Sequence, residues 1–473
     1  MDIHIIDLII FLGYLVFMLG VGVYFLNKNK SQEDYYVGGR NMSAGHIGLS
    51  VVATDVGGGF SIGLGGLGFL MGLSGSWMLF TGLLGAWISA VFLIPKIYPI
   101  AKKHQFLTFP ESLAFHYNKK VALMAGIISL IGYIGFTSSQ ILAGAKLASA
   151  TFPSISITKA VLIMGIIAVV YTVIGGIKAV IYTDTIQWII LMVGLVGIGI
   201  PMGYIEIGGW NAIKEAVPAS FLTLNNVKFI DLFNWIITIV PIWFVGMTLY
   251  QRIYACKDEQ TAKKAWKIAG FFEYPIMAFM GVALGLFSRV AYEQGMFASI
   301  GYSPDSVLLD AELGLPLLLR TILPVGLMGL MMSAYFSAIM STADSCLMAA
   351  SGNLTTDIFG YFKKTISIKN TQVITFLIGG VAILIATVMH NVLELMLYSY
   401  AFMVSGLLIP VLGSLLLKNP SSKAALYSMI TGGSTTLILI LTEIELPLGL
   451  DANFFGITAA LIVFSFFQKV DKK

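Results

Sequence analysis

Charge, cysteine and histidine are all scarce in this sequence. Only 11% of its 473 residues are charged and 57% are hydrophobic, with a mean hydropathy of +0.88; this composition excludes a soluble globular domain. The two cysteines are too few for a disulfide framework, and neither has the spacing of a metal ligand. The five histidines are scattered near loops without a nucleophile–base pair, and no Walker lysine motif is present. We therefore expect neither an enzyme nor an ATP-driven pump.

Apolar runs of about 20 residues, the length that crosses roughly 30 Å of hydrocarbon, recur along the whole chain. They predict an all-α polytopic membrane protein that forms one transmembrane domain over residues 1–473. The first run lacks a small-residue cleavage site, so we expect it to be an uncleaved span. We expect about thirteen spans, near residues 5–26, 42–71, 74–98, 121–150, 158–174, 179–203, 230–254, 266–290, 324–357, 372–390, 392–416, 424–442 and 453–468.

The distribution of basic residues predicts the orientation. If the N-terminus lies outside, 22 of the 28 Lys and Arg residues, Arg252 among them, fall in cytoplasmic segments, whereas the outer loops are acidic. Lys146 lies near the outer end of span 4, and we expect it to snorkel to the outer interface. On this count no arginine lies inside the bundle. We expect an inner (plasma) membrane protein with its N-terminus outside and its C-terminus in the cytoplasm.

The second predicted span carries a polar stretch, Ala53-Thr54-Asp55-Val56-Gly57-Gly58-Gly59. Each glycine inside a helix costs about 1 kcal/mol relative to alanine, so three in a row predict that the helix unwinds. The freed carbonyls need partners in hydrocarbon, and a bound cation is one; close packing alone is the other interpretation of the glycines. An ionisable group at membrane depth is costly, so Asp55 indicates an ion or substrate path.

Span 7 is the second candidate for a broken helix, because Pro241 and Gly246 flank Trp243. Pro241 alone would indicate only a kink. Spans 2 and 7 are five spans apart, however, and would open the two halves of a five-plus-five inverted repeat. Interrupted helices at matching positions of two halves indicate the central site of a transporter.

Span 9 carries hydroxyl groups at helical spacing. Ser337, Ser341 and Ser345 fall on one stripe, and Asp344 lies beside Ser341. Hydroxyl, carboxylate and carbonyl oxygens suit a hard cation such as sodium. A single serine in a membrane helix often only bonds back to its own turn, but this density of hydroxyls favours ion binding.

Asp184 is a third carboxylate within the predicted bundle, about one turn into span 6 from the cytoplasmic face. It could hold an ion, or it could cap a helix or pair with Lys178. Together with the two broken helices, the buried carboxylates indicate a transporter.

These motifs resemble the sodium:solute symporter family, over nearly the whole chain. The most specific are Val37-Gly38-Gly39-Arg40, the Gly-Gly…Ala-Val…Thr-Asp…Gln pattern around Asp184, and Met340-Ser341-Thr342-Ala343-Asp344-Ser345. The resemblance implies sodium-coupled symport and the inverted-repeat fold of the bacterial leucine transporter. The core (spans 2–11) would run from residue 42 through 254 to 416, with peripheral helices in residues 1–30 and 424–473.

The resemblance also implies where sodium binds. A principal site would use the carbonyls of Ala53, Val56 and Ala338 and the hydroxyls of Ser341 and Thr342. A second site, present in some members, would correspond to Asp184, Ser341, Asp344 and Ser345. One or two sodium ions are therefore expected. Asp344 stands where some relatives carry serine, so the second site would be more acidic and could take a proton instead.

The solute does not follow from the resemblance. Asp55 matches the sodium-linked aspartate of the proline carriers, but Gly59 replaces the tryptophan that follows it there. The Val-Gly-Gly-Gly run is similar to the choline carriers, yet of their aromatic cage only Phe136 keeps an aromatic residue.

The scarcity of basic residues in the bundle disfavours strongly anionic solutes. A single carboxylate could bind at the helix ends of span 2, and Asp55 could take an amine. We therefore favour a small zwitterion or cation, amino-acid-like or amine-like, over a sugar or monocarboxylate. The candidate solute-binding residues are Asp55, Gly57, Gly58, Phe60, Ser61, Phe80, Phe136, Ser138, Gln140, Trp243 and Met247. Each aromatic residue among them could equally serve ordinary helix packing.

We expect alternating access, in which sodium binds from outside, stabilises the unwound part of span 2 and moves inward with the solute. Spans 2, 3, 7 and 8 would rock against a scaffold, in a protein that works as a monomer. Three alternatives remain. A proton-coupled carrier of the same fold would use Asp55, Asp184 and Asp344, but a proton needs no cage of hydroxyls. A channel would need a symmetric ring or a continuous polar pore, and an enzyme would need a catalytic pair.

Overall fold

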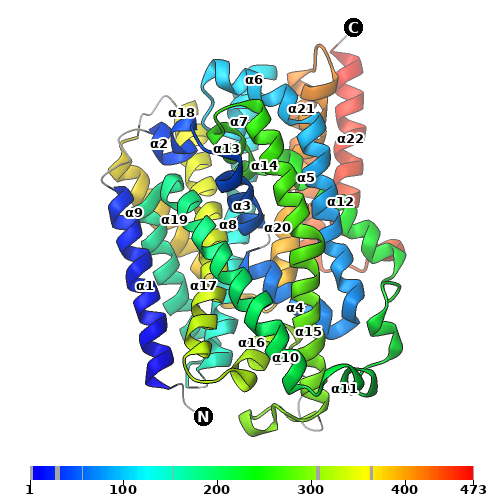
Figure 1. Cartoon of the computed structure of the whole chain (residues 1–473). Helices are drawn as coiled ribbons and strands as arrows, with labels where there is room; N and C mark the ends of the chain where they lie inside the picture. The colour runs from blue at the N-terminus through cyan, green and yellow to red at the C-terminus, as the bar shows by residue number, and fades with distance from the viewer. Residues whose placement is uncertain are drawn as a thin grey trace.

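The chain folds into a bundle of helices, seen in the computed structural model of Figure 1. The structure describes residues 4–26, 32–55, 57–152, 154–304, 309–362 and 366–471. The first helices are α1 (Ile5–Leu26), α2 (Gln32–Val37), α3 (Ala44–Asp55), α4 (Gly58–Met71), α5 (Trp77–Phe92), α6 (Ile94–His104), α7 (Phe109–His116), α8 (Lys119–Thr151), α9 (Ile157–Leu191) and α10 (Ile200–Glu206).

The second part of the chain continues with helices of the same kind. They are α11 (Gly209–Ala216), α12 (Phe229–Val245), α13 (Met247–Ala255), α14 (Glu259–Phe271), α15 (Ala278–Glu293), α16 (Ala311–Ile322), α17 (Leu327–Gly352), α18 (Phe359–Tyr361), α19 (Ile368–Val388), α20 (Val392–Leu416), α21 (Ser422–Thr442) and α22 (Ala452–Val470). A π-helical turn, η5 (Phe272–Met277), joins α14 to α15.

The long helices run roughly parallel to one axis, with α8 and α17 in the interior, α1 at one edge and α22 at the other (Figure 1). The two ends of the chain lie at opposite ends of the bundle (Figure 1). By length and composition, eight helical stretches of the described chain are able to cross a membrane, or nine if the bent pair of α12 and α13 is one span. The expected count of thirteen is therefore not confirmed.

The predicted break in span 2 lies between α3 and α4. Gly57 stands between the two half-helices with φ −45° and ψ −164°, outside helical geometry. A β-carbon on Gly57 would lie 1.5 Å from Thr342 Oγ1, and one on Gly58 would lie 1.9 Å from Ile339 Cγ1. The glycines thus serve both the unwinding and a close approach to α17, because any side chain here would collide with it.

The second predicted break lies at Gly246, where α12 and α13 meet at an angle of 42°. Helix α8 supplies a side chain to each break. Gln140 Oε1 accepts a hydrogen bond from Gly59 N at 2.8 Å, and the Tyr133 hydroxyl accepts one from Thr248 N at 3.2 Å. Since Tyr133 and Gln140 are seven residues apart, they share one face of α8. One rigid helix therefore satisfies backbone groups that both broken spans expose.

Helix α9 is assigned as continuous from Ile157 to Leu191, but contacts between its two parts show that it is not straight. Tyr171 and Thr183 would be about 18 Å apart along a straight helix, yet Tyr171 Oη lies 3.3 Å from Thr183 Oγ1. Thr172 and Asp184 also both contact α17, at Asp344 and Ser341. The parts of α9 before residue 174 and after residue 179 therefore lie against each other instead of following one straight axis.

Candidate functional site

The hydroxyl-rich stretch of α17 faces the end of α3. Thr342 Oγ1 donates to the Ala53 carbonyl at 3.1 Å and also lies 3.4 Å from the Ala338 carbonyl. Next to them is a cavity of about 10 Å³, lined by Ala53, Gly57, Gln187, Trp188, Leu191, Met277, Ala338 and Ser341. This volume admits one particle the size of a water molecule. Three of the five residues predicted for the principal sodium site line this space, and a fourth, Thr342, contacts the carbonyls of two of them. The fifth, Val56, lies outside the described residues.

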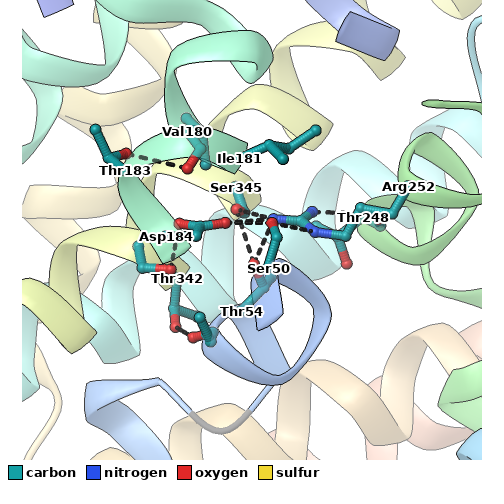
Figure 2. A network of polar contacts seen from close by, with 12 residues as sticks. Ser50, Thr54, Val180, Ile181, Thr183, Asp184, Thr248, Arg252, Thr342 and Ser345 are labelled. Atoms are coloured by element: carbon teal, nitrogen blue, oxygen red, sulfur yellow. Dashed lines mark hydrogen bonds and ion pairs between the residues drawn. The ribbon is translucent and has the colours of Figure 1, made fainter. Parts of the chain in front are cut away.

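A second polar cluster is centred on Arg252 of α13, whose side chain is fully buried (Figure 2). Its Nη2 lies 3.1 Å from Asp184 Oδ2 and 2.8 Å from Ser345 Oγ, and its Nε donates to Ser50 Oγ at 2.9 Å. Asp184 also accepts hydrogen bonds from Ser50 and, at 2.5 Å, from Ser341. The cluster joins α3, α9, α13 and α17 around one ion pair.

This cluster corrects the expectation that no arginine lies within the bundle. Arg252 lies six residues beyond the break at Gly246, where the chain axis turns by 42°. Counting residues along a straight span therefore does not reveal that its side chain is buried among the helices. A guanidinium can be buried here because it is paired with a carboxylate and donates to hydroxyl and carbonyl oxygens.

Of the residues predicted for a second sodium site, three meet in this cluster and one does not. Asp184, Ser341 and Ser345 are in contact with one another or with Arg252. Asp344 instead accepts a hydrogen bond from Thr172 at 2.5 Å, while its second oxygen has no protein partner. The side chain therefore turns toward the first segment of α9 and away from Arg252.

Lys146 does not snorkel to the outer interface, which corrects the second expectation about basic residues. Its side chain is only 2% exposed, and Nζ lies 2.6 Å from Asp310 and 2.7 Å from Glu312. Glu312 in turn accepts from the amides of Val392 and Leu393 at the start of α20. Lys146 thus ties α8 to α16 and α20, and its charge is neutralised there. These two acidic residues line part of a cavity of about 600 Å³ between α4, α16 and α20.

Some of the predicted solute-binding residues form one group around Asp55. The Tyr400 hydroxyl of α20 donates to Asp55 Oδ1 at 3.2 Å, and the Phe136 ring meets Tyr400 edge-on at 4.9 Å between centroids. Gly57 and Gly58 follow Asp55 directly, and Ser61 is buried in the first turn of α4. The structure does not describe the side chain of Phe60.

The remaining predicted residues are engaged elsewhere. Gln140 holds the α4 amide described above, and Ser138 Oγ bonds back to the Ile134 carbonyl. Met247 Sδ accepts from the Phe109 amide. Trp243 packs on Gly85 and lies edge-on to Trp266, and Phe80 contacts Trp77 and Tyr274. The contacts of Trp243 and Phe80 are those of ordinary helix packing, which was the alternative interpretation of the aromatic residues.

The residues described contain no group of three His, Cys, Asp or Glu side chains able to hold a metal ion. Any ion in these clusters would be held largely by hydroxyl and carbonyl oxygens, the ligands of a hard monovalent cation. A helical membrane bundle with two broken helices, an ion-sized cavity at the contact of α3 with α17, and paired buried charges has the architecture of a secondary active transporter.

Comparison with known proteins gives the family. The family model of the sodium:solute symporters matches residues 35–432, and the chain belongs to that family. The sodium/glucose cotransporter of Vibrio parahaemolyticus is 27% identical over 98% of this chain and 90% of its own. The sodium/proline symporter of Escherichia coli (strain K12) is 27% identical over 91% of this chain and 87% of its own.

The fold is similar to that of a Na⁺-coupled sialic acid symporter, solved in a substrate-bound, outward-open state. The TM-score is 0.79 at 21% identity, covering 98% of both chains. The predictions of an all-α symporter fold and of sodium-coupled symport are confirmed. The relatives are transporters, so the expectation that this chain is no enzyme is confirmed too. It is a multi-pass membrane protein that couples sodium to a small solute.

Proposed function

We propose that sodium binds between α3 and α17, coordinated by the carbonyls of Ala53, Val56 and Ala338 and the hydroxyls of Ser341 and Thr342. The observation that carries this proposal is the contact of Thr342 with the Ala53 carbonyl beside an ion-sized cavity. Thr342 Oγ1 and the Ala53 carbonyl oxygen lie 3.1 Å apart, so one sodium ion could bind a lone pair of each. The Gly57 backbone can approach these oxygens because it has no side chain.

In this proposal, sodium stabilises the unwound segment of span 2 in its solute-binding shape. Asp55 lies two residues from Ala53, so the ion site and the solute site share one stretch of backbone. Binding at α17 would also fix α3 against the scaffold. Release of sodium toward the cytoplasm would let α3 separate from α17 and lower the affinity for the solute.

We propose one sodium per transport cycle. A second ion at Asp184, Ser341 and Ser345, with or without Asp344, would have to displace the Arg252 guanidinium, which already lies 3.1 Å from the carboxylate. The fixed positive charge of Arg252 thus takes the place of a second ion. This favours a single exchangeable sodium over two.

We propose a zwitterionic or cationic solute, amino-acid-like or amine-like, bound near Asp55, Phe136 and Tyr400. The remaining predicted solute-binding residues would line the path when the bundle opens. Support comes from the two buried basic side chains of the described chain, Arg252 and Lys146, which are both neutralised by carboxylates and leave no free cation for an anionic solute. A sugar or a monocarboxylate is the second candidate cargo. The second candidate coupling is a proton, which the partnerless Asp344 oxygen favours.

The proposed setting is an inner (plasma) membrane, with the N-terminus outside, the C-terminus in the cytoplasm, and a monomer as the working unit. A membrane potential drives such a cycle, because each positive charge that moves inward through 100 mV contributes about 2.3 kcal/mol. A sodium ion with a singly cationic solute would gain roughly 4.6 kcal/mol.

The test is the thermal stability of the detergent-purified protein in sodium against potassium, at constant ionic strength, across a panel of small solutes. We expect sodium to raise the melting temperature and one class of solute to raise it further. Equal melting temperatures in the two salts, with a pH-dependent response to a solute, would replace sodium by a proton as the coupling ion.

A further inference from the structure

A second buried carboxyl group meets Asp55, and the sequence pattern did not single it out. Glu273, in the π-helical turn η5, is fully buried, and its carboxyl group lies next to that of Asp55. Three oxygens of this pair, Asp55 Oδ2 and both Glu273 oxygens, have no other protein partner. Asp55 Oδ1 is held by the Tyr400 hydroxyl.

The surroundings leave room for this carboxyl group. A β-carbon on Gly82 of α5 would lie 2.0 Å from Glu273 Oε2. Glycine at this position therefore lets the carboxyl group rest against the α5 backbone. The pair thus lies among α3, α5 and η5, which belong to the mobile spans 2, 3 and 8 of the proposed mechanism, and Tyr400 joins it to the scaffold.

No protein cation serves the pair. The two buried basic side chains of the described chain are Lys146, which pairs with Asp310 and Glu312, and Arg252, which pairs with Asp184. Two carboxylates in contact away from water repel each other, and either a shared proton or a positive group between them relieves this repulsion. Neither buried basic side chain supplies that positive group, so the pair is able to accept an external cation in exchange for a proton.

We propose that Asp55 and Glu273 together bind the primary ammonium group of the transported solute; this proposal rests on the proposed function. A primary ammonium has three N–H donors, and the pair offers three oxygens without other partners. A trimethylated ammonium has no N–H to donate, and a neutral hydroxyl brings no charge. The Tyr400 and Phe136 rings would then contact the carbon chain next to the nitrogen.

The experiment uses the full-length purified protein in sodium buffer, and the readout is the solute concentration that gives half of the maximal thermal shift. The probes are the protein amino acids, ethanolamine and putrescine. Each is compared with its N-trimethyl derivative and with the analogue that carries hydroxyl in place of the amine, such as lactate for alanine. We expect a shift from at least one primary amine and at least a tenfold weaker response to both of its analogues. Shifts only from neutral, anionic or trimethylated solutes, or from no member of the panel, would overturn the ammonium site.

Two variants locate the site. Glu273→Gln should weaken the response to the amine by at least tenfold and leave the shift caused by sodium alone unchanged. Gly82→Ala should do the same, because its methyl group displaces the Glu273 carboxylate, and it provides the test if Glu273→Gln fails to fold. The matched control is Glu259→Gln, the same change on the surface of α14, where Glu259 pairs only with Lys263; it should change neither response.

The outcomes separate this inference from the proposed function. A wild-type protein without any sodium–potassium difference contradicts the proposed sodium coupling. A normal sodium response with unaltered amine binding in Glu273→Gln and Gly82→Ala overturns the ammonium site alone. Loss of the sodium response in a folded Glu273→Gln would instead assign the pair to sodium, and would also overturn it.

Discussion

The Arg252 guanidinium lies 3.1 Å from the Asp184 carboxylate, and both side chains are fully buried. Arg252 belongs to α13 and Asp184 to α9, and the other partners in the cluster come from α3 and α17 (Figure 2). Removing one partner of a buried ion pair destabilises a protein more than removing both, because the remaining charge stays buried without a partner.

Arg252→Gln should destabilise the protein by about 3–5 kcal/mol, because it leaves the Asp184 carboxylate buried without a cation. Arg252→Gln combined with Asp184→Asn should recover a large part of that loss. The measurement is the melting temperature of the purified variants. If the double variant is less stable than Arg252→Gln alone, then Asp184 contributes through its hydroxyl partners rather than through the ion pair.

Gly57→Ala should abolish the stabilisation by sodium, because the new methyl group would lie 1.5 Å from Thr342 Oγ1, inside the proposed ion site. The readout is the difference in melting temperature between sodium and potassium. Gly380→Ala is the matched control, since a β-carbon on Gly380 of α19 meets nothing within 4 Å. A sodium shift of normal size in Gly57→Ala would place the ion elsewhere.

Lys146→Gln should lower stability by about 1–3 kcal/mol, because Asp310 and Glu312 lose their cation while Asp310 keeps some access to water. The affinity for sodium should stay unchanged, because Lys146 does not belong to the proposed ion site. Both are measured by thermal unfolding at increasing sodium concentration. A change in solute affinity without a change in stability would give Lys146 the role in solute binding that its ion pairs argue against.

Deprotonation of Asp451 should lower the stability of the protein as pH rises from about 4 to 6. Asp451 precedes α22 and lies outside the spans. Asp451 is exposed as a residue, but loss of water around its carboxyl group and the nearby Asp231 raise its pKa to about 6, so in this range the folded state binds more protons than the unfolded state. Asp451→Asn should therefore melt higher than the wild type at pH 7 and like it near pH 4. An unchanged difference between the two proteins across this range would contradict the raised pKa.

Asp258→Asn should have the opposite effect on stability at neutral pH, because the pKa of Asp258 is lowered rather than raised. Asp258 caps α14 by accepting from Thr261 N at 2.7 Å, and this hydrogen bond lowers its pKa. Its contribution is present at neutral pH and is lost as pH falls through the lowered pKa. Asp258→Asn should therefore lower the melting temperature at pH 7 relative to the wild type, with a smaller difference in acid.

The sequence predicted the features that depend on local pattern. Three successive glycines located the break in span 2, and Gly246 located the one in span 7, since both act on the backbone of their own helix. The spacing of Ser341 and Ser345 placed these hydroxyls on one stripe of α17, because that spacing is the helical repeat itself, and both contact the Arg252 cluster.

Features that depend on the direction of a half-helix or on a distant partner were missed. Arg252 follows a break, so its depth depends on a bend that no residue count provides. Lys146 finds its partners 164 and 166 residues away in an outer segment. Glu273 is the one carboxylate in its predicted span. The space for its carboxyl group is provided by Gly82 in another helix, α5, and local sequence does not reveal such a distant neighbour. The hydrogen bond between Thr172 and Asp344 was missed for the same reason, because it depends on the path of α9.

The most direct test of the proposed sodium site is equilibrium binding of radiolabelled sodium to the purified protein and to its Thr342→Ala variant, with potassium balancing the ionic strength. We expect saturable binding of one sodium ion per chain in the wild type and at least a tenfold weaker affinity in Thr342→Ala. Binding that is absent, or that Thr342→Ala leaves unchanged, would contradict the site between α3 and α17.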